Sequence, residues 1–87
     1  MASMRYRPAV YVRRGRYHSR LNMVGFGADS IAEIATAFDT PEEALTDLMA
    51  RLRLVYQFGD RVEVRGAVYR DVGAVEAALR ESLPLSD

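Results

Sequence analysis

The chain has 87 residues and no net charge, because twelve arginines balance twelve acidic residues; it holds one histidine, no lysine and no cysteine. The lack of cysteine excludes a disulfide framework, a thiol nucleophile and a cysteine-based zinc site, and a single histidine excludes paired-histidine metal motifs. No apolar run approaches the roughly 20 residues that cross a bilayer, so we predict a soluble cytoplasmic protein. Arginine as the only basic residue is typical of GC-rich bacterial or phage genes.

The charge is unevenly distributed along the chain. Residues Met1–Ala28 hold six arginines and no acid, which gives +6, and residues Asp29–Asp87 hold six arginines and twelve acids, which gives −6. Such asymmetry indicates either a basic docking surface or internal pairing of the basic segment with later acidic elements. The sequence leaves both interpretations open.

The first predicted element is an antiparallel hairpin. Residues Met4–Arg13 alternate between apolar and polar side chains, as in a half-buried strand, and Arg16–Phe26 also has strand character. Arg14-Gly15 between them suits a two-residue loop, because glycine adopts the positive φ that such loops need. Pro8 cannot donate to a ladder, which places this strand at an edge or turns its amide outward.

The register of this hairpin separates two faces. The inward pairs would be Val12 with Tyr17, Val10 with Ser19, Pro8 with Leu21 and Tyr6 with Met23. The outward pairs would be Arg13 with Arg16, Tyr11 with His18, Ala9 with Arg20 and Arg7 with Asn22. We therefore expect Val10, Val12 and Leu21 inside and an arginine-rich face in water.

The following segment is ambiguous. Gly25, Gly27 and Asp29 predict a bend. Ile31–Phe38 then fits a third strand, but it also fits a helix, because Ser30 and Glu33 match a capping box. We favour the strand.

A helix is predicted over Pro41–Phe58. Thr40 is a suitable N-cap, proline suits the first helical position, and Glu42 and Glu43 suit the positive end of the helix dipole. Gly59 is expected to end the helix, and Asp47 and Arg51 are spaced to pair across one turn. The predicted buried stripe consists of Leu45, Leu48, Met49, Leu52 and Tyr56.

The last elements are a strand over Arg61–Tyr69 and a helix over 72–83 that Asp71 caps. In the strand, Val62, Val64 and Val68 would share one face opposite Glu63 and Arg65, and Gly66 would form a bulge; a hairpin at Arg65-Gly66 is the less favoured variant. Val72, Val75 and Leu79 would face inward from the final helix. The fold predicted for residues 1–87 is one small α+β domain, β-β-β-α-β-α, with a mainly antiparallel sheet and two helices on one face.

Motifs for chemistry are lacking in the sequence. Gly25-Phe26-Gly27 has no third glycine at dinucleotide-binding spacing, and without lysine there is no P-loop. His18 has no nucleophile beside it, and the helix dipole accounts for Glu42 and Glu43. We predict that the protein is not an enzyme and uses no cofactor or metal.

The arginine-rich face is the candidate binding site. Arginine and tyrosine are enriched at protein-interface hot spots, which predicts a module that binds a protein partner stoichiometrically as a regulator or inhibitor. The alternative is an RNA or single-stranded nucleic-acid module that uses the same face. Strand addition at a sheet edge would give a homodimer. The predicted partner-binding residues are Arg5, Arg7, Tyr11, Arg13, Arg16, His18 and Arg20.

One segment resembles a known family. The strand leading into Asp39-Thr40-Pro41-Glu42-Glu43-Ala44-Leu45 is similar to the strand-to-helix junction of HicB-type antitoxins, over about a quarter of the chain. The segment before it, Gly25–Phe38, lacks the proline- and glycine-containing motif of that family. The resemblance implies a β-β-β-α-β core and a protein partner, a small RNA-cleaving toxin. A phage-encoded blocker of a host defence complex is another form that an inhibitor would take.

Overall fold

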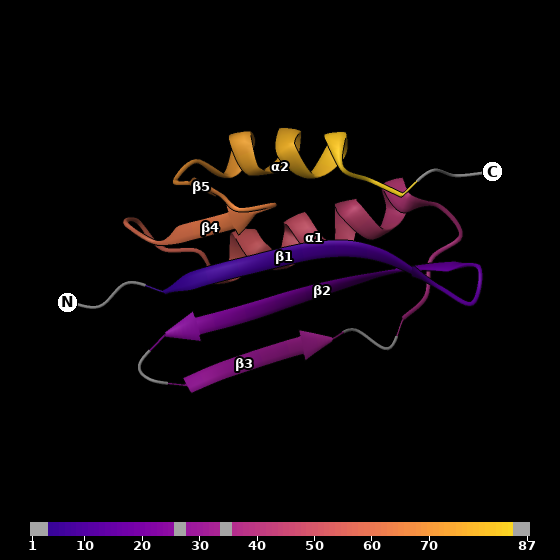
Figure 1. Ribbon diagram of the computed structural model, residues 1–87, viewed down its shortest axis with the longest axis horizontal. Coiled ribbons are helices and arrows are strands. Elements are labelled where there is room, and N and C mark those ends of the chain that lie inside the picture. Colours follow the sequence, from indigo (N-terminus) through magenta and orange to yellow (C-terminus); the bar gives the residue numbers. More distant parts are fainter. Residues whose placement is uncertain (1–3, 26–27, 34–35, 85–87) are drawn as a thin grey trace.

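The computed structural model describes residues 4–25, 28–33 and 36–84. Over these residues, five strands and two helices follow one another in the order β-β-β-α-β-β-α (Figure 1). They form a small α+β domain, as predicted. The elements are β1 (Arg5–Arg13), β2 (Arg16–Gly25), β3 (Ala28–Glu33), α1 (Pro41–Val55), β4 (Arg61–Val64), β5 (Ala67–Tyr69) and α2 (Val72–Glu81).

The N-terminal hairpin has the predicted register. Arg13 pairs with Arg16 and Tyr11 with His18, and the pairing continues to Arg5 and Val24. Arg14 and Gly15 form the loop with φ of 54° and 76°. Positive φ at both positions matches the right-handed twist of the two strands, which is why this short loop closes the hairpin.

β3 confirms the strand predicted after the hairpin but shifts its boundaries. It spans Ala28–Glu33 instead of Ile31–Phe38, and it pairs antiparallel with β2. Asp29 therefore lies in the strand and not in the predicted bend. Gly27 and Ile34 lie outside the described residues. Phe38 makes an isolated bridge to Tyr17, which ties the end of this segment to the hairpin before α1 begins.

The five strands form one sheet in the order β3-β2-β1-β4-β5. β1 and β4 pair in parallel at Arg5–Arg61 and Tyr6–Val62, and the other neighbours are antiparallel. The sheet is thus mainly antiparallel, as predicted. β3 runs in the same direction as β1, and α1 carries the chain back along the sheet between β3 and β4, so β4 is parallel to β1.

The single strand predicted over Arg61–Tyr69 is wrong, and the hairpin variant is right. Arg65 and Gly66 form a second two-residue loop with φ of 52° and 83°, so Gly66 lies in a turn and not in a bulge. The turn changes which face each later residue occupies. Val68 pairs with Glu63 and is 53% exposed, whereas Val62 and Val64 are buried.

Both helices cover one face of the sheet, where the core lies (Figure 1). α1 packs on β1 and β2, and α2 packs on β4 and β5 and along α1. The predicted α1 stripe is buried, with Tyr56 packed at its border, and Val75 and Leu79 complete the core from α2. Thr40 caps α1 by accepting from the Glu43 N–H at 3.2 Å, and Asp71 caps α2 through the Ala74 N–H at 3.1 Å.

α1 ends at Val55, three residues before the predicted Phe58. Tyr56 adopts an extended backbone, and its hydroxyl lies 3.0 and 2.8 Å from the carbonyl oxygens of Asp60 and Arg70, which share its one proton. Phe58 is fully exposed, so no packing holds another helical turn. Gly59, with φ of 94°, serves the turn before β4 instead of ending the helix.

Two further boundaries differ from the prediction. α2 ends at Glu81, and Ser82 caps it. Val12 is 48% exposed, not inside the core, because it lies near the loop end of the hairpin, beyond the helix layer; Val10 packs against the core and Leu21 is buried, as predicted. The inward-facing part of β1 thus ends at Val10.

A buried carboxylate connects the N-terminus of β1 to the end of α1. Asp60, 5% exposed, accepts from the Tyr6 hydroxyl at 2.9 Å and from the backbone N–H groups of Met4 and Gln57 at 3.0 and 2.9 Å. The sequence analysis did not single out this residue. Asp60 precedes β4, so the same group also positions the start of that strand.

Candidate functional site

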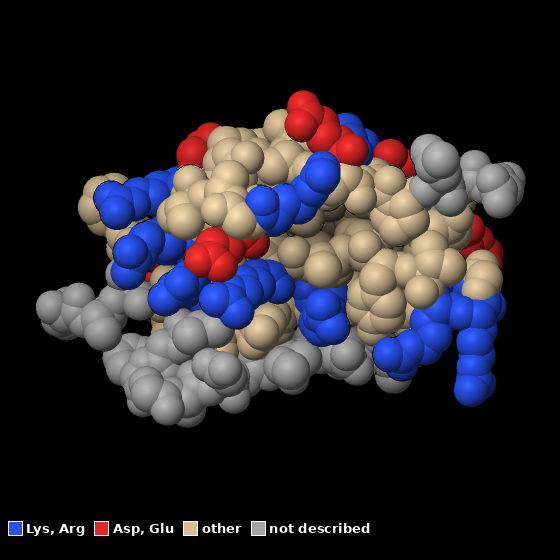
Figure 2. Space-filling model, viewed as in Figure 1, with Lys and Arg blue, Asp and Glu red and all other residues tan. Residues whose placement is uncertain are grey.

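The outer face of β1 and β2, away from the helices, carries the predicted partner-binding residues. Figure 2 shows arginine side chains along these strands in the lower half of the view, and acidic side chains over the helix layer at the top. The alternation of β1 and β2 sends the seven side chains to this one face, because residues two apart on a strand share a face. The structure then divides them into three groups: Arg5 with Arg7, Arg16 alone, and the cluster Tyr11, Arg13, His18 and Arg20.

Tyr11 is the centre of the third group, which we call the Tyr11 cluster. The ring of His18, its cross-strand partner, stacks on it with centroids 5.4 Å apart and planes at 18°. The guanidinium carbons of Arg13 and Arg20 lie 5.5 and 5.6 Å from the centroid of the Tyr11 ring. Such cation–π contacts contribute about 0.5–1 kcal/mol at exposed sites and restrict the arginine rotamers.

Arg5 and Arg7 are held by an acid from a neighbouring strand. Glu63 of β4 accepts from Arg5 Nη1 at 3.0 Å and from Arg7 Nε at 2.9 Å. The two arginines hold the pKa of the Glu63 carboxyl below its usual range, first through these hydrogen bonds and then through their charge. For these two residues the internal-pairing interpretation is therefore correct.

Arg16 is also occupied within the chain. Its guanidinium lies 3.2 Å from Asp39 and donates to the carbonyls of Ala37 and Phe38. These contacts fasten the segment before α1 to the loop end of the hairpin. The sequence analysis placed Arg16 on the correct face but did not predict its partner Asp39. It also did not predict Glu63 as the partner of Arg5 and Arg7, because in both cases the partners are distant in the sequence. The Cα register between β1 and β4 joins residues more than fifty positions apart, and no local pattern in the sequence indicates it.

Half of the arginines have no acidic partner among the described residues. Six form ion pairs: Arg5, Arg7, Arg16, Arg51, Arg53 and Arg80. Among the side chains that the structure describes, in residues 4–23 and 36–84, no carboxylate lies within ion-pair distance of the other six. They are Arg13, Arg14, Arg20, Arg61, Arg65 and Arg70. In the backbone register, Glu33 of β3 is the partner of Arg20.

The described part of the chain holds no group of three or more histidine, aspartate or glutamate side chains that would bind a metal ion. No helix within it is long and apolar enough to cross a membrane. His18 is engaged with Tyr11 on the open face. Glu42 and Glu43 lie in the first turn of α1, where Glu43 completes the cap with Thr40. Phe26 and Gly27 of the Gly25-Phe26-Gly27 run lie outside the described residues.

The comparisons with known proteins add no relative. A scan against protein-family models, a search of curated proteins and a search of solved structures each found no match for this chain. Its function is therefore argued from its own surface.

Proposed function

We propose that this protein is a non-enzymatic interaction module that binds an acidic surface of a partner protein through the Tyr11 cluster. The observation that carries the proposal is the pair of guanidinium groups, Arg13 and Arg20, that share one tyrosine ring while no described carboxylate pairs with either. An arginine without an internal acid retains its full capacity to bind a carboxylate in a bidentate manner.

The geometry of the cluster supports a binding role. Contact with the Tyr11 ring limits the conformations of both arginines before a partner arrives, so less side-chain entropy is lost on docking. Tyr11 and His18 add a flat, rigid apolar contact between the charges. An arginine pair around an aromatic anchor is the composition typical of interface hot spots.

Arg5, Arg7 and Arg16 have a secondary part in this proposal. Each already donates to an acid or to backbone carbonyls, so a partner would have to replace those contacts. They contribute positive potential at the rim, which accelerates encounter with an acidic surface more than it raises affinity. The docking surface is thus smaller than the seven residues predicted from sequence.

The biological form we propose is a small cytoplasmic regulator or inhibitor that acts by occupying its partner, without a cofactor. An antitoxin-like or anti-defence-like role would fit that form. The run from Asp39 to Leu45 does not by itself support an antitoxin, because helix capping by Thr40, Pro41 and Glu43 accounts for it.

A charge-reversal pair tests the docking surface. We expect the double variant Arg13→Glu/Arg20→Glu to lose a partner that the wild type captures from a lysate of a GC-rich bacterium. Its melting temperature should fall by about 8 °C at most, because the variant breaks no ion pair among the described residues and the acid that it places opposite Glu33 in the backbone register costs about 1 kcal/mol or less. Arg70→Glu is the matched control: it reverses an arginine that likewise has no described acidic partner but lies between β5 and α2, and it should retain the partner.

Three outcomes contradict the proposal. The first is loss of the partner in Arg70→Glu as well, which would indicate general charge attraction. The second is early unfolding of the double variant, which would give the cluster a structural role. The third is RNA or single-stranded DNA binding that falls steeply with salt and requires Arg13 and Arg20. The stacking of His18 on Tyr11 argues against that third outcome, because a ring that already stacks within the protein is less available to a base.

A further inference from the structure

β1 has a free backbone edge along more than half of its length. It pairs with β2 throughout, but with β4 only at Arg5 and Tyr6. The Arg61 N–H donates to the Met4 carbonyl at 3.1 Å, which begins the parallel ladder. In that ladder, the bond after Tyr6 would need an N–H at position 8, and Pro8 has none. Beyond Pro8, no described strand pairs with this side of β1.

The alternation of hydrogen bonds identifies which groups are free. In a two-residue hairpin, the residues that flank the loop bond to each other, and every second residue does the same. Arg13 flanks the loop, so Tyr11 and Arg13 direct their backbone groups toward β2. The N–H and C=O groups of Val10 and Val12 therefore point to the open edge. A row of unpaired groups of this kind is a template for an added strand.

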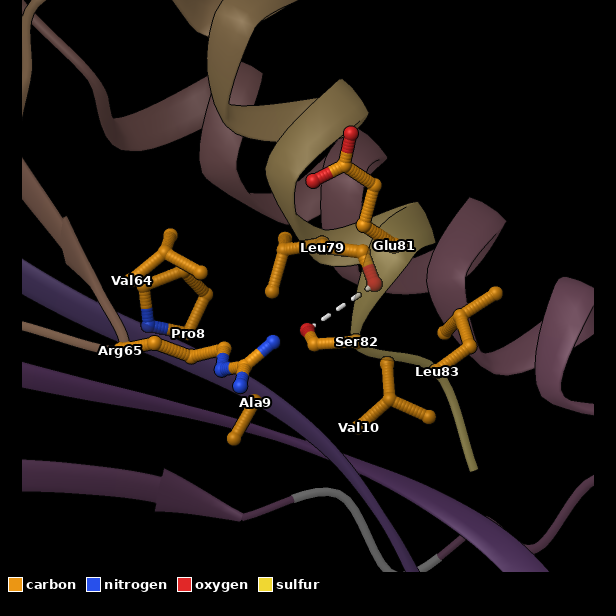
Figure 3. Close-up of a pocket in the computed structure, with 9 residues that line it drawn as sticks. All are labelled: Pro8, Ala9, Val10, Val64, Arg65, Leu79, Glu81, Ser82 and Leu83. Carbon is orange, nitrogen blue, oxygen red and sulfur yellow. Dashed lines mark hydrogen bonds between the residues drawn. The ribbon is translucent and has the colours of Figure 1, made fainter. Parts of the chain in front are cut away.

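A pocket of about 560 Å³ lies beside this edge. Figure 3 shows that β1, the end of β4 and the C-terminal end of α2 line it. In the same view the guanidinium of Arg65 extends toward Ser82, and the carboxylate of Glu81 points away from Arg65. The apolar lining includes Val10, Val64, Leu79 and Leu83, beside the polar side chains of Arg65, Glu81 and Ser82.

We propose that this edge and pocket bind an extended segment of another protein in which apolar and acidic side chains alternate. Side chains of an added strand point alternately to the two faces of the sheet. The apolar ones would enter the pocket on the helix side. The acidic ones would point to the outer face, where Arg13 lies and has no acidic partner among the described residues.

A second copy of this chain is a poorer occupant. Two copies of β1 paired antiparallel about Val10 would place Arg13 opposite Arg7 of the other copy. Like charges directly opposite across a strand pair are destabilising. The inference goes beyond the proposed function, because strand addition uses the backbone edge and the pocket. The two proposals share Arg13 of the Tyr11 cluster, and Arg20→Glu, which lies away from the edge, tests them separately.

The probe is a fluorescent, end-capped peptide of alternating valine and glutamate, with alternating valine and lysine as its charge control. We expect the wild type to bind the first peptide and not the second in an anisotropy titration. Val12→Pro removes one edge donor and should weaken binding about three- to tenfold, the effect of one lost hydrogen bond. Val12→Thr keeps the donor, and Arg20→Glu alters the Tyr11 cluster away from the edge; both should bind as the wild type does.

Amide hydrogen exchange of the wild type gives a second measurement that needs no folded Val12→Pro variant. The peptide should slow exchange at Val10 and Val12 and leave Tyr11, which already bonds to β2, unchanged. Failure of the valine–glutamate peptide to bind, or binding without added protection at these two amides, overturns the proposal. So does a dimer in light scattering that Val12→Pro dissociates, because the second copy would then cover the edge. If Arg20→Glu loses the protein partner but still binds the peptide, the two proposals separate.

Discussion

At the scale of single residues, one buried carboxylate shows how a polar group specifies the fold. The Asp60 side chain, just before β4, accepts from Met4 and Tyr6 at the start of β1 and from Gln57 after the end of α1. A buried acceptor with several donors is tolerated because its hydrogen bonds replace those it made with water. The start of β1, the end of α1 and the start of β4 are therefore fastened at one point.

Tyr6 makes this network sensitive to alkaline pH. Burial, and then the hydrogen bond and charge of Asp60, raise the pKa of Tyr6 from 10.0 to about 12. The protonated hydroxyl is thus favoured by folding: its contribution is complete below about pH 10 and is lost as the pH rises through 12. We expect the wild type to lose on the order of 2 kcal/mol of unfolding free energy over this range.

The Tyr6→Phe variant is the comparison. It should be less stable at neutral pH, because the bonds to Val55 and Asp60 are gone, but should lack this alkaline loss. Urea unfolding at neutral pH and at about pH 12 measures both effects. An equally steep alkaline loss in Tyr6→Phe would show that another group is responsible.

At the scale of elements, two Arg-Gly loops connect two of the antiparallel strand pairs, β1 with β2 and β4 with β5. Arg14 and Arg65 have φ of 54° and 52°. This left-handed conformation is unfavourable for residues other than glycine and asparagine. The strands accept this cost because a two-residue loop of this type fits their twist. The Arg-Gly dipeptide is the same in both places, yet the sequence analysis favoured a loop only at Arg14-Gly15.

Asparagine at these positions should stabilise the protein. We expect Arg14→Asn and Arg65→Asn each to raise the unfolding free energy by about 0.5–1 kcal/mol, because asparagine adopts positive φ more readily. Gly15→Ala should lower it by about 1 kcal/mol. A Cβ there would meet nothing within 4 Å, so the cost is conformational only. Thermal unfolding measures all three variants, and an asparagine variant less stable than the wild type would contradict this account.

At the scale of the whole molecule, opposite charges connect the two helices while the far side of the sheet stays basic. Arg53 of α1 bonds to Glu76 of α2 at 2.8 Å, and Arg80 bonds to Glu42 and lies 3.5 Å from Glu76. The net charge of zero therefore does not describe either surface. Because many of the acids are engaged in the helix layer, the Tyr11 cluster is left without an internal carboxylate among the described residues.

Acidic pH should weaken the ion pairs that Glu76 of α2 forms with Arg53 of α1 and with Arg80. Arg53 first, and then Arg80, hold the pKa of Glu76 below its usual 4.5. This contribution is complete above pH 4.5 and is lost as the pH falls through the lowered pKa. We expect Glu76→Gln to be slightly less stable at neutral pH and to lose less stability on acidification. Glu81→Gln is the control, since no described arginine pairs with Glu81; an acid profile identical to that of Glu76→Gln would contradict the assignment.

Much of the local structure followed from the residues alone. The hairpin register came from alternation in Met4–Arg13 and a glycine loop, and the helix starts came from Thr40 and Asp71, because these signals act over a few neighbouring residues. The seven candidate residues were placed on one face for the same reason. The short β4–β5 hairpin was mispredicted because its strands are too brief to show a period, and the end of α1 depended on the distant Arg70 carbonyl.

The sequence by itself determined that arginines gather on one side of a hairpin, since a period of two is a property of neighbouring residues. Only the tertiary structure decided which of them pair with acidic side chains among the described residues. The parallel pairing of β1 with β4 placed Glu63 beside Arg5 and Arg7, and the segment before α1 placed Asp39 beside Arg16. Charges pair according to distance in space, and the chain must fold before residues so far apart in sequence come within a few ångströms.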